Sequence, residues 1–284
     1  MNRTVLLFVG QPRGVTHPLW LKEYKRASEL LTGSVDVVCV TAEDDRPEGR
    51  LFGYGNKLWN PNNLHGGEHK LKAPLNKPAW EEYMREQFAW TNSVHFAYAS
   101  GEPTDAVSYG MRQFVYVEDA VRKLPRFWQS HADSTVIKLR YDAVSHKNSE
   151  PGMGLYAWQR STARFLHAMK TYDHSKDNDA PNMIFDVWQM HAGLPWCSDY
   201  VWGQDGTAIQ VQGKLIREWI ESYNPPLRKN NVHPESYMPM FAAEHNFNIA
   251  HKLQFDNWDK NQLKGMVPLA SFVEEMDDWR KWYQ

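Results

Sequence analysis

The chain has 284 residues with 32 basic and 34 acidic side chains, which gives a formal net charge of −2. This balance counts against bulk electrostatic binding of nucleic acid, although a local basic groove is compatible with it. No apolar run approaches the roughly 18 residues of a membrane-spanning helix, so no membrane insertion is expected. The two cysteines form neither a disulfide framework nor a CxxC zinc site, which predicts a reducing, cytoplasmic setting, or the host cytoplasm for a viral protein.

The first forty residues predict a β-loop-α-β unit. Thr4–Gly10 is a continuous apolar run, and the Gln11-Pro12-Arg13 turn after it favours a first buried strand over a signal peptide. Helical spacing follows over Pro18–Leu31, and Val35–Thr41 forms a second short apolar run. This order is typical of an open α/β sheet, in which ligands bind near the carboxyl ends of the strands.

The middle of the chain alternates loop, helix and strand. Residues 42–79 are rich in Asn, Gly, Pro and charge, which predicts a surface excursion, either a lid or acceptor-binding loop or a simple variable loop. Helices are predicted over Pro78–Trp90 and over Tyr109–Phe127, the second broken at Pro125. Thr135–Leu139 predicts another buried strand.

The remaining elements are predicted within the same single domain, which spans residues 1–284. A polar turn, SDYVWGQDG, opens the segment Ser198–Tyr223 and leads into a helix. The other predictions are a helix over Gly154–Met169, a strand over Met183–Met190, a helix over Pro234–His245 and a helical tail over 246–284.

One group of residues at a strand end is suited to phosphate chemistry. Asp142 follows the predicted strand Thr135–Leu139, with Lys138 and Arg140 just before it. A carboxylate at that edge can hold a divalent cation such as Mn²⁺ or Mg²⁺, and the cations can pair with phosphate oxygens. A surface salt-bridge cluster is the alternative interpretation.

Three further segments have both a structural and a functional interpretation. Ser198-Asp199 suits a helix cap, or a carboxylate that acts as a general base. Glu235 in a first helical turn is favoured by the helix dipole alone. Gly10–Arg13 forms either an ordinary βα turn or a contact to a base or phosphate. The 13 Trp residues suit core packing or stacking platforms for sugars and bases.

Taken in order, these segments resemble the WavE-like and related viral or capsular-polysaccharide glycosyltransferases of the GT-A kind. The matches span roughly residues 4–245, with Tyr141 at a usually small position and no match for the insert at 42–79. The motifs that carry the resemblance are Gly10-Gln11-Pro12-Arg13, Arg112-Gln113 without the preceding Asn, Lys138/Arg140/Asp142, Ser198-Asp199 with Gly203, and Pro234-Glu235-Ser236-Tyr237.

The resemblance implies a single GT-A-like domain with a central, mostly parallel sheet flanked by helices, and a nucleotide-sugar donor, first of all a UDP-sugar. Asp142 stands in the place of the DxD aspartate and is the implied metal ligand, while Arg140 replaces the first Asp and takes over part of the diphosphate charge. Asp199 is the implied base of an inverting transfer. The implied donor-side residues are Gly10, Gln11, Arg13, Gln113, Lys138, Arg140 and Asp142, and the implied acceptor-side residues are Glu235 and Trp202.

Two acceptors and one alternative function stay open. The acceptor is either a glycan or a hydroxymethylated base in phage or viral DNA, and the DNA case needs a flipped base and a basic groove. Arg122, Lys123 and Arg126 form one small basic helical face, and stacking side chains would be Trp59, Trp80 and Trp90. The alternative is a non-catalytic carbohydrate- or nucleotide-binding protein on the same scaffold.

Overall fold

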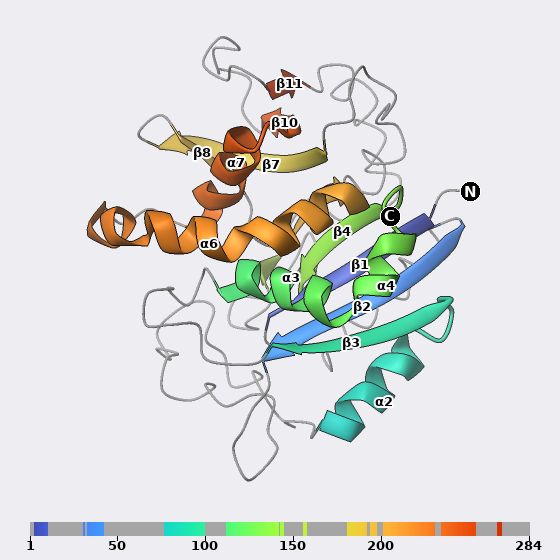
Figure 1. Cartoon of the computed structure of the whole chain (residues 1–284). Coiled ribbons are helices and arrows are strands. Elements are labelled where there is room, and N and C mark those ends of the chain that lie inside the picture. Colours follow the sequence, from blue (N-terminus) through green and yellow to red (C-terminus); the bar gives the residue numbers. More distant parts are fainter. Residues whose placement is uncertain are drawn as a thin grey trace.

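The computed structural model describes the chain in segments that together form an α/β fold (Figure 1). The described residues are 3–10, 31, 33–42, 77–99, 112–141, 143–144, 156–157, 181–191, 194–197, 201–230, 234–253 and 266–268. Within these segments, no helix combines the length and the hydropathy needed to cross a bilayer.

Nine strands of the described chain form one mixed, mostly parallel sheet. Its order is β11-β10-β7-β9-β4-β1-β2-β3, with β8 paired to β7 outside this path. Only β9 runs against its neighbours along the path, because it pairs antiparallel with both β4 and β7. The strands are β1 (Arg3–Val9), β2 (Ser34–Ala42), β3 (Ser93–Ala99), β4 (Thr135–Arg140), β7 (Asn182–His191), β8 (Leu194–Cys197), β9 (Val201–Asp205), β10 (Asn248–Leu253) and β11 (Met266–Pro268). A separate pair joins β5 (Ala143–Val144) to β6 (Tyr156–Ala157).

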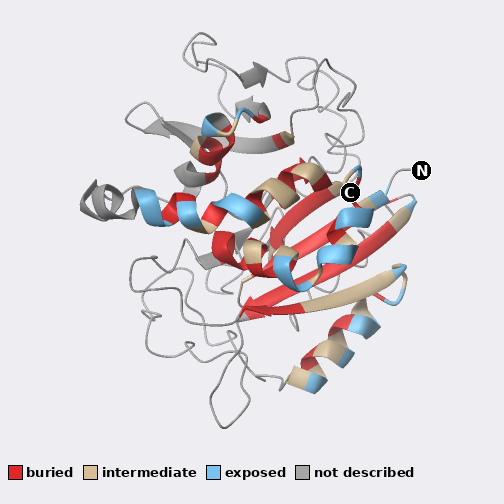
Figure 2. Cartoon of the chain, in the orientation of Figure 1, coloured by how far each residue is buried: buried red, intermediate tan, exposed pale blue. Residues whose placement is uncertain are grey.

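Helices cover both faces of the strands at the centre of the sheet. The described helices are α2 (Lys77–Gln87), α3 (Arg112–Lys123), α4 (Pro125–Ser130), α6 (Gly206–Asn230) and α7 (Pro234–Glu244). In Figure 1, α3, α4 and α6 lie together over one face, and α2 lies beyond β3. The strands between them are the buried part of the molecule, as Figure 2 shows in red, while the outer sides of the helices are exposed.

The alternation of side chains along β1 explains this two-sided packing. Val5, Leu7 and Val9 share a core with residues of α3 and α4, and all three are fully buried. Phe8 points to the other face, where its ring lies 5.5 Å from that of Phe88 and 5.5 Å from that of Tyr141. Burying one such side chain contributes about 1.5–3 kcal/mol, so both layers stabilise the strand.

Close contact between α3 and α6 depends on a glycine. A Cβ placed on Gly213 would lie 2.4 Å from Cβ of Val121, so any larger residue would force the two helices apart. The two helices therefore form a tight layer over one face of the sheet.

Most predicted elements are present with small shifts of their ends. Four predicted strands are present as β1, β2, β4 and β7, which were predicted at Thr4–Gly10, Val35–Thr41, Thr135–Leu139 and Met183–Met190, respectively. The helix Pro78–Trp90 is α2, the helix broken at Pro125 is the pair α3 and α4, and Pro234–His245 is α7. A mostly parallel sheet packed against helices is thereby confirmed as the fold class.

Several predictions differ from the structure. The polar turn predicted after Ser198 contains β9, and the range 246–284, predicted as a helical tail, contains β10 and β11. Tyr156–Ala157 is strand β6, where a helix was predicted over Gly154–Met169. Strand β3 was not predicted, because its alternating SVHFAYA is short and follows directly on a helix. The helix predicted over Pro18–Leu31 and most of 42–79 lie outside the described residues.

Candidate functional site

The sheet has a topological switch point between β1 and β4. These strands are parallel neighbours with Val9 opposite Arg140, while β1 pairs on its other side with β2. The chain therefore leaves β1 toward one edge of the sheet and later returns to β4 on the opposite side. In open α/β sheets, ligands bind at the carboxyl ends of the strands at such a point.

Gly10 forms the carboxyl end of β1 at this switch point. Its φ of 116° lies in the region that glycine adopts without strain, and its backbone N–H donates to the carbonyl of Val40 at 3.1 Å. A Cβ on Gly10 would have no described atom within 4 Å. Among the described residues, none blocks a ligand from the backbone at this point.

A buried cation lies on β4 next to this edge. Lys138 is fully buried, although lysine is almost never fully buried unless it is paired. Its Nζ donates to Oε1 of Gln113, in the first turn of α3, and lies 3.9 Å from the ring centroid of Trp202 on β9. The register explains the second contact, because Lys138 stands directly opposite Trp202 in the antiparallel pair. Arg140, two residues further on, points to the same face of the sheet.

The structure thus brings Trp202, an implied acceptor-side residue, together with two implied donor-side residues. Lys138 contacts both Gln113 and Trp202, and Gly10 and Arg140 lie at the carboxyl ends of the adjacent strands β1 and β4. Gln11, Arg13, Asp142 and Asp199 lie outside the described residues, and with them the implied metal ligand and base. Glu235 belongs to α7, but its side chain is outside the described part.

Trp202 differs from its predicted role on the acceptor side. It is only 1% exposed, and its ring packs 5.6 Å from that of Phe114 in the core. Its register on β9 turns it inward between the sheet and α3. It contacts the buried ammonium and not a surface that a glycan reaches. Its indole N–H is one of the buried donors for which the described residues provide no hydrogen-bond acceptor.

The opposite face of the same edge holds a second polar group that sequence reasoning missed. Burial raises the pKa of the Cys39 thiol far above its ordinary value, so this thiol is not a nucleophile. Tyr141, whose hydroxyl donates to the carbonyl of Val40, is also fully buried, and burial likewise raises its pKa. Near them, the Thr41 hydroxyl and the Trp80 indole N–H are buried without a described hydrogen-bond partner. Trp80 is therefore part of the core and not an exposed stacking platform.

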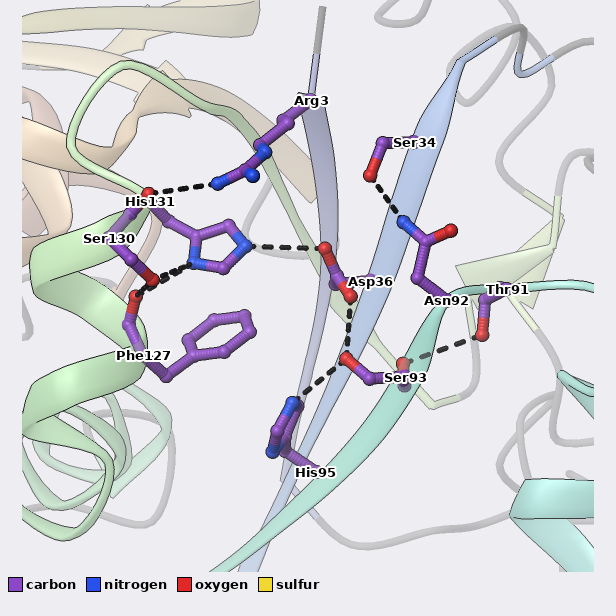
Figure 3. Close-up of polar contacts among 10 residues, drawn as sticks. All are labelled: Arg3, Ser34, Asp36, Thr91, Asn92, Ser93, His95, Phe127, Ser130 and His131. Atoms are coloured by element: carbon purple, nitrogen blue, oxygen red, sulfur yellow. Dashed lines mark hydrogen bonds and ion pairs between the residues drawn. The ribbon is translucent and has the colours of Figure 1, made fainter.

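A third polar cluster lies at the amino ends of β2 and β3, under α4 (Figure 3). Asp36 accepts a hydrogen bond from Ser93 at 2.5 Å and lies 3.2 Å from Nε2 of His131. Oγ of Ser93 also lies 2.8 Å from Nε2 of His95. The other nitrogen of His131 lies 2.7 Å from the carbonyl oxygen of Phe127. The sequence feature that could have predicted this cluster is Asp36 within the apolar run VDVVCV, because a carboxylate in a buried strand requires a polar partner.

The two histidines of this cluster differ in environment. Burial lowers the pKa of His95, and the nearby Asp36 carboxylate partly offsets this effect. His131 stacks on the Phe127 ring with centroids 3.9 Å apart, and both of its nitrogens face oxygen acceptors. An arrangement in which every group is satisfied by its neighbours, at the amino ends of the strands, fits a structural role.

Neither edge of the sheet has an evident cation site among the described residues. No three histidine, cysteine or acidic side chains in that part of the chain are placed so that they can hold a metal ion. At the carboxyl edge, the described charged groups next to Asp142 in the chain are Lys138 and Arg140.

No protein-family model matches the sequence, and no curated protein matches it at a significant level. The residues that bear on function are therefore those at the switch point, Gly10, Lys138 and Arg140.

Proposed function

We propose that the chain is a glycosyltransferase of the GT-A kind, which transfers a sugar from a nucleotide-sugar donor, first of all a UDP-sugar, to an acceptor hydroxyl. The observation that carries the proposal is that Gly10, in a positive-φ conformation at the end of β1, lies at one switch point beside the end of β4, which carries the basic residues Lys138 and Arg140. A nucleoside diphosphate needs both features, because its backbone contacts require space and its phosphates require positive charge. The single reversed strand β9 in an otherwise parallel path is compatible with this architecture.

Each group at this edge has a distinct part in the proposed reaction. Gly10 lets the donor approach the end of β1, and Arg140 pairs with the diphosphate. In an inverting transfer, the acceptor oxygen attacks the anomeric carbon as the bond to the diphosphate breaks. The hydroxyl proton passes to Asp199, and the leaving diphosphate takes the electron pair. Fixed positive charge stabilises that leaving group most strongly in the transition state.

Asp142, the metal ligand that the family resemblance implies, lies outside the described residues. Mn²⁺ and Mg²⁺ sites are built from several oxygen ligands, whereas the described charged residues that precede Asp142 in the chain, Lys138 and Arg140, are basic. We therefore assign no step of the reaction to a metal ion.

Donor binding is tested by thermal shift with UDP-, GDP-, CMP- and dTDP-sugars. A donor at 100 times its Kd stabilises the folded state by about 2.7 kcal/mol, which corresponds to roughly 5–10 °C for a chain of this size. The absence of any shift with all four donors would refute the proposal. Asp142→Asn is expected to lower transfer by roughly 10²-fold or more in a protein that stays folded, because we propose that this carboxylate binds the ribose-diphosphate part of the donor.

The role of Asp199 is tested separately from donor binding. Asp199→Ala is expected to lose transfer while it binds the nucleotide-sugar with about wild-type affinity, because a general base acts on the acceptor. Loss of donor binding would move Asp199 to the donor pocket. Loss of the fold would show that it only caps a helix.

Among acceptors, a glycan is favoured over DNA. The exposed Arg122 bonds to the Asp119 carboxylate, and Lys123 donates to the carbonyl of Tyr98, so these side chains already have partners. A DNA gel shift at low and moderate salt distinguishes the two acceptors. The alternative, a non-catalytic binding protein with tryptophan platforms, is weakened by the burial of Trp80 and Trp202. Donor hydrolysis without an acceptor separates an enzyme from such a protein.

A further inference from the structure

His131, at the end of α4, has both of its ring nitrogens against oxygen atoms (Figure 3). Its Nδ1 lies 2.7 Å from the carbonyl oxygen of Phe127, and its Nε2 lies 3.2 Å from Oδ2 of Asp36. The other oxygen of Asp36 accepts a hydrogen bond from Ser93 at 2.5 Å, as an ionised carboxylate does. Carbonyl and carboxylate oxygens only accept hydrogen bonds, so each nitrogen of His131 needs a hydrogen, which makes the ring an imidazolium.

The neighbouring Ser130 hydroxyl does not remove this requirement. It lies 3.0 Å from Nδ1 of His131, but it donates its hydrogen to the carbonyl of Phe127 at 2.8 Å. If that hydrogen turned to Nδ1 instead, the nitrogen lone pair would face the carbonyl oxygen at 2.7 Å with no hydrogen between them. The short contact to the carbonyl therefore requires a hydrogen on Nδ1.

The end of α7 repeats one half of this arrangement. The ring of His245 packs on that of Phe241 with centroids 4.1 Å apart, and its Nδ1 lies 2.8 Å from the carbonyl oxygen of Phe241. The corresponding distances for His131 and Phe127 are 3.9 Å and 2.7 Å. No carboxylate of the described residues bonds to Nε2 of His245. One hydrogen, on Nδ1, therefore satisfies His245, whereas His131 needs two.

Loss of one hydrogen from His131 breaks a contact on one side of its ring. Either Asp36 loses one of its two donors, or the ring loses the carbonyl of Phe127, and a buried group is left unpaired. The backbone of His131 has little room to adjust, because a Cβ on Gly206 would lie 1.8 Å from its carbonyl oxygen. The proton thus affects the junction where α4 meets the sheet and the start of α6.

We infer that the second proton of His131 holds the end of α4 on the sheet, so that this junction opens when the pH rises above the neutral range. The charged or titratable side chains around it are Asp36 of β2, His95 of β3, Arg3 of β1, which donates to the last residue of α4, and the exposed Asp133 of the following turn. The inference is independent of the proposed glycosyltransferase activity, because it concerns the amino ends of the strands.

His95 acts in the opposite direction within the same cluster. Burial lowers the pKa of His95, the Asp36 carboxylate partly offsets this effect, and the charges of His131 and Arg85 add to it. His95 therefore bonds to Ser93 as the neutral ring while His131 carries the proton. The cluster then holds one carboxylate and one imidazolium, and either a further proton on His95 or the loss of one from His131 ends that balance.

Nitrogen NMR of the full chain shows directly which histidine nitrogens carry a hydrogen. At about pH 7, long-range ¹H–¹⁵N correlation spectra should show hydrogens on both nitrogens of His131 and on Nδ1 alone of His245. This measurement uses the wild type, so it does not depend on whether a variant folds. A His131 ring with a single hydrogen would overturn the inference.

Hydrogen exchange tests the junction itself through the amides of Trp128 and His131, which donate to the carbonyls of Leu124 and Trp128. Because the attached form binds one proton more than the detached form, their protection should fall by up to about tenfold per pH unit above neutrality. In His131→Gln, an amide donor faces Asp36 at every pH, so this dependence should disappear. His245→Gln is the matched control and should keep it.

Two results of the exchange experiment would refute a role for the proton. One is protection of the α4 amides in the wild type that does not change with pH. The other is a folded His131→Gln variant whose protection still falls as the pH rises. Neither result bears on nucleotide-sugar binding, so the proposed function stands or falls separately.

Discussion

Removing the buried pair formed by Asp36 and His131 should destabilise the protein far more than removing an exposed pair of the same length (Figure 3). Asp36 is 7% exposed, and its two oxygens accept hydrogen bonds from different partners, Ser93 and His131. The pair links β2 to the end of α4, so its loss affects the attachment of a helix to the sheet. Asp36→Ala and His131→Phe are the two substitutions, and the second retains a ring to stack on Phe127.

The magnitude follows from the hydrogen bonds that each change removes. Hydrogen bonds to a charged group contribute about 1.5–3 kcal/mol each, and Asp36→Ala removes two of them. We therefore expect Asp36→Ala to lower the free energy of unfolding by about 3–5 kcal/mol, the usual cost of breaking a buried pair. The coupling energy between Asp36 and His131 in a double-mutant cycle should be about 1–3 kcal/mol.

Urea unfolding of the wild type, both single variants and the double variant gives the coupling energy directly. The control cycle uses Arg85 and Glu81, whose atoms are also 3.2 Å apart but whose side chains are 52% and 29% exposed. Solvent screening limits that pair to about 0.3–0.5 kcal/mol. A buried pair whose coupling does not exceed that of the control would refute the reasoning.

Three other predictions concern packing, pH and the sheet edge. Gly213→Ala should destabilise the protein by about 1–3 kcal/mol despite the better helix propensity of alanine, and Val121→Ala in the same chain should restore part of that loss in urea unfolding. Burial lowers the pKa of His95, so the unfolded chain binds a proton at this residue more readily than the folded protein does. The free energy of unfolding should therefore fall as the pH drops below about 6.5. His95→Gln should reduce this pH dependence, and an unchanged dependence would contradict the lowered pKa of His95. Arg85 and Lys123 donate hydrogen bonds to backbone carbonyls of β3, the strand at one edge of the described sheet. Replacing both with alanine exposes these carbonyls to pairing with another chain, so self-association measured by light scattering should increase. A variant that stays monomeric would show that these two side chains do not protect the edge.

The sequence by itself determined the parts of the fold that depend on local pattern. Continuous apolar runs at Thr4–Gly10, Val35–Thr41 and Thr135–Leu139 predict strands buried on both faces, and these are the central strands β1, β2 and β4. Pro125 stops α3 wherever that helix packs, because proline lacks the N–H that the helix needs. The position of Gly10 at a strand end also follows from the sequence alone.

Other elements were decided only by tertiary structure. The VWGQD of β9 carries glycine and polar residues and has no strand pattern of its own, but it forms a strand because β4 and β7 offer it hydrogen-bonding partners on both sides. The same applies to β10 and β11. Strand β10 pairs with β7, which lies far from it in the sequence, and β11 pairs with β10.

The side-chain contacts of the candidate site also could not be predicted from the sequence. The sequence predicted that Lys138 pairs with phosphate oxygens, and the family resemblance implied that Trp202 lies on the acceptor side. The antiparallel register of β4 and β9 instead places them opposite one another, and α3 covers both. Which side chains face inward depends on pairing between segments some sixty residues apart, and a one-residue change of register would have reversed it. Sequence pattern therefore predicts that basic residues lie at this strand end, while the sheet pairing decides whether their side chains are exposed or buried.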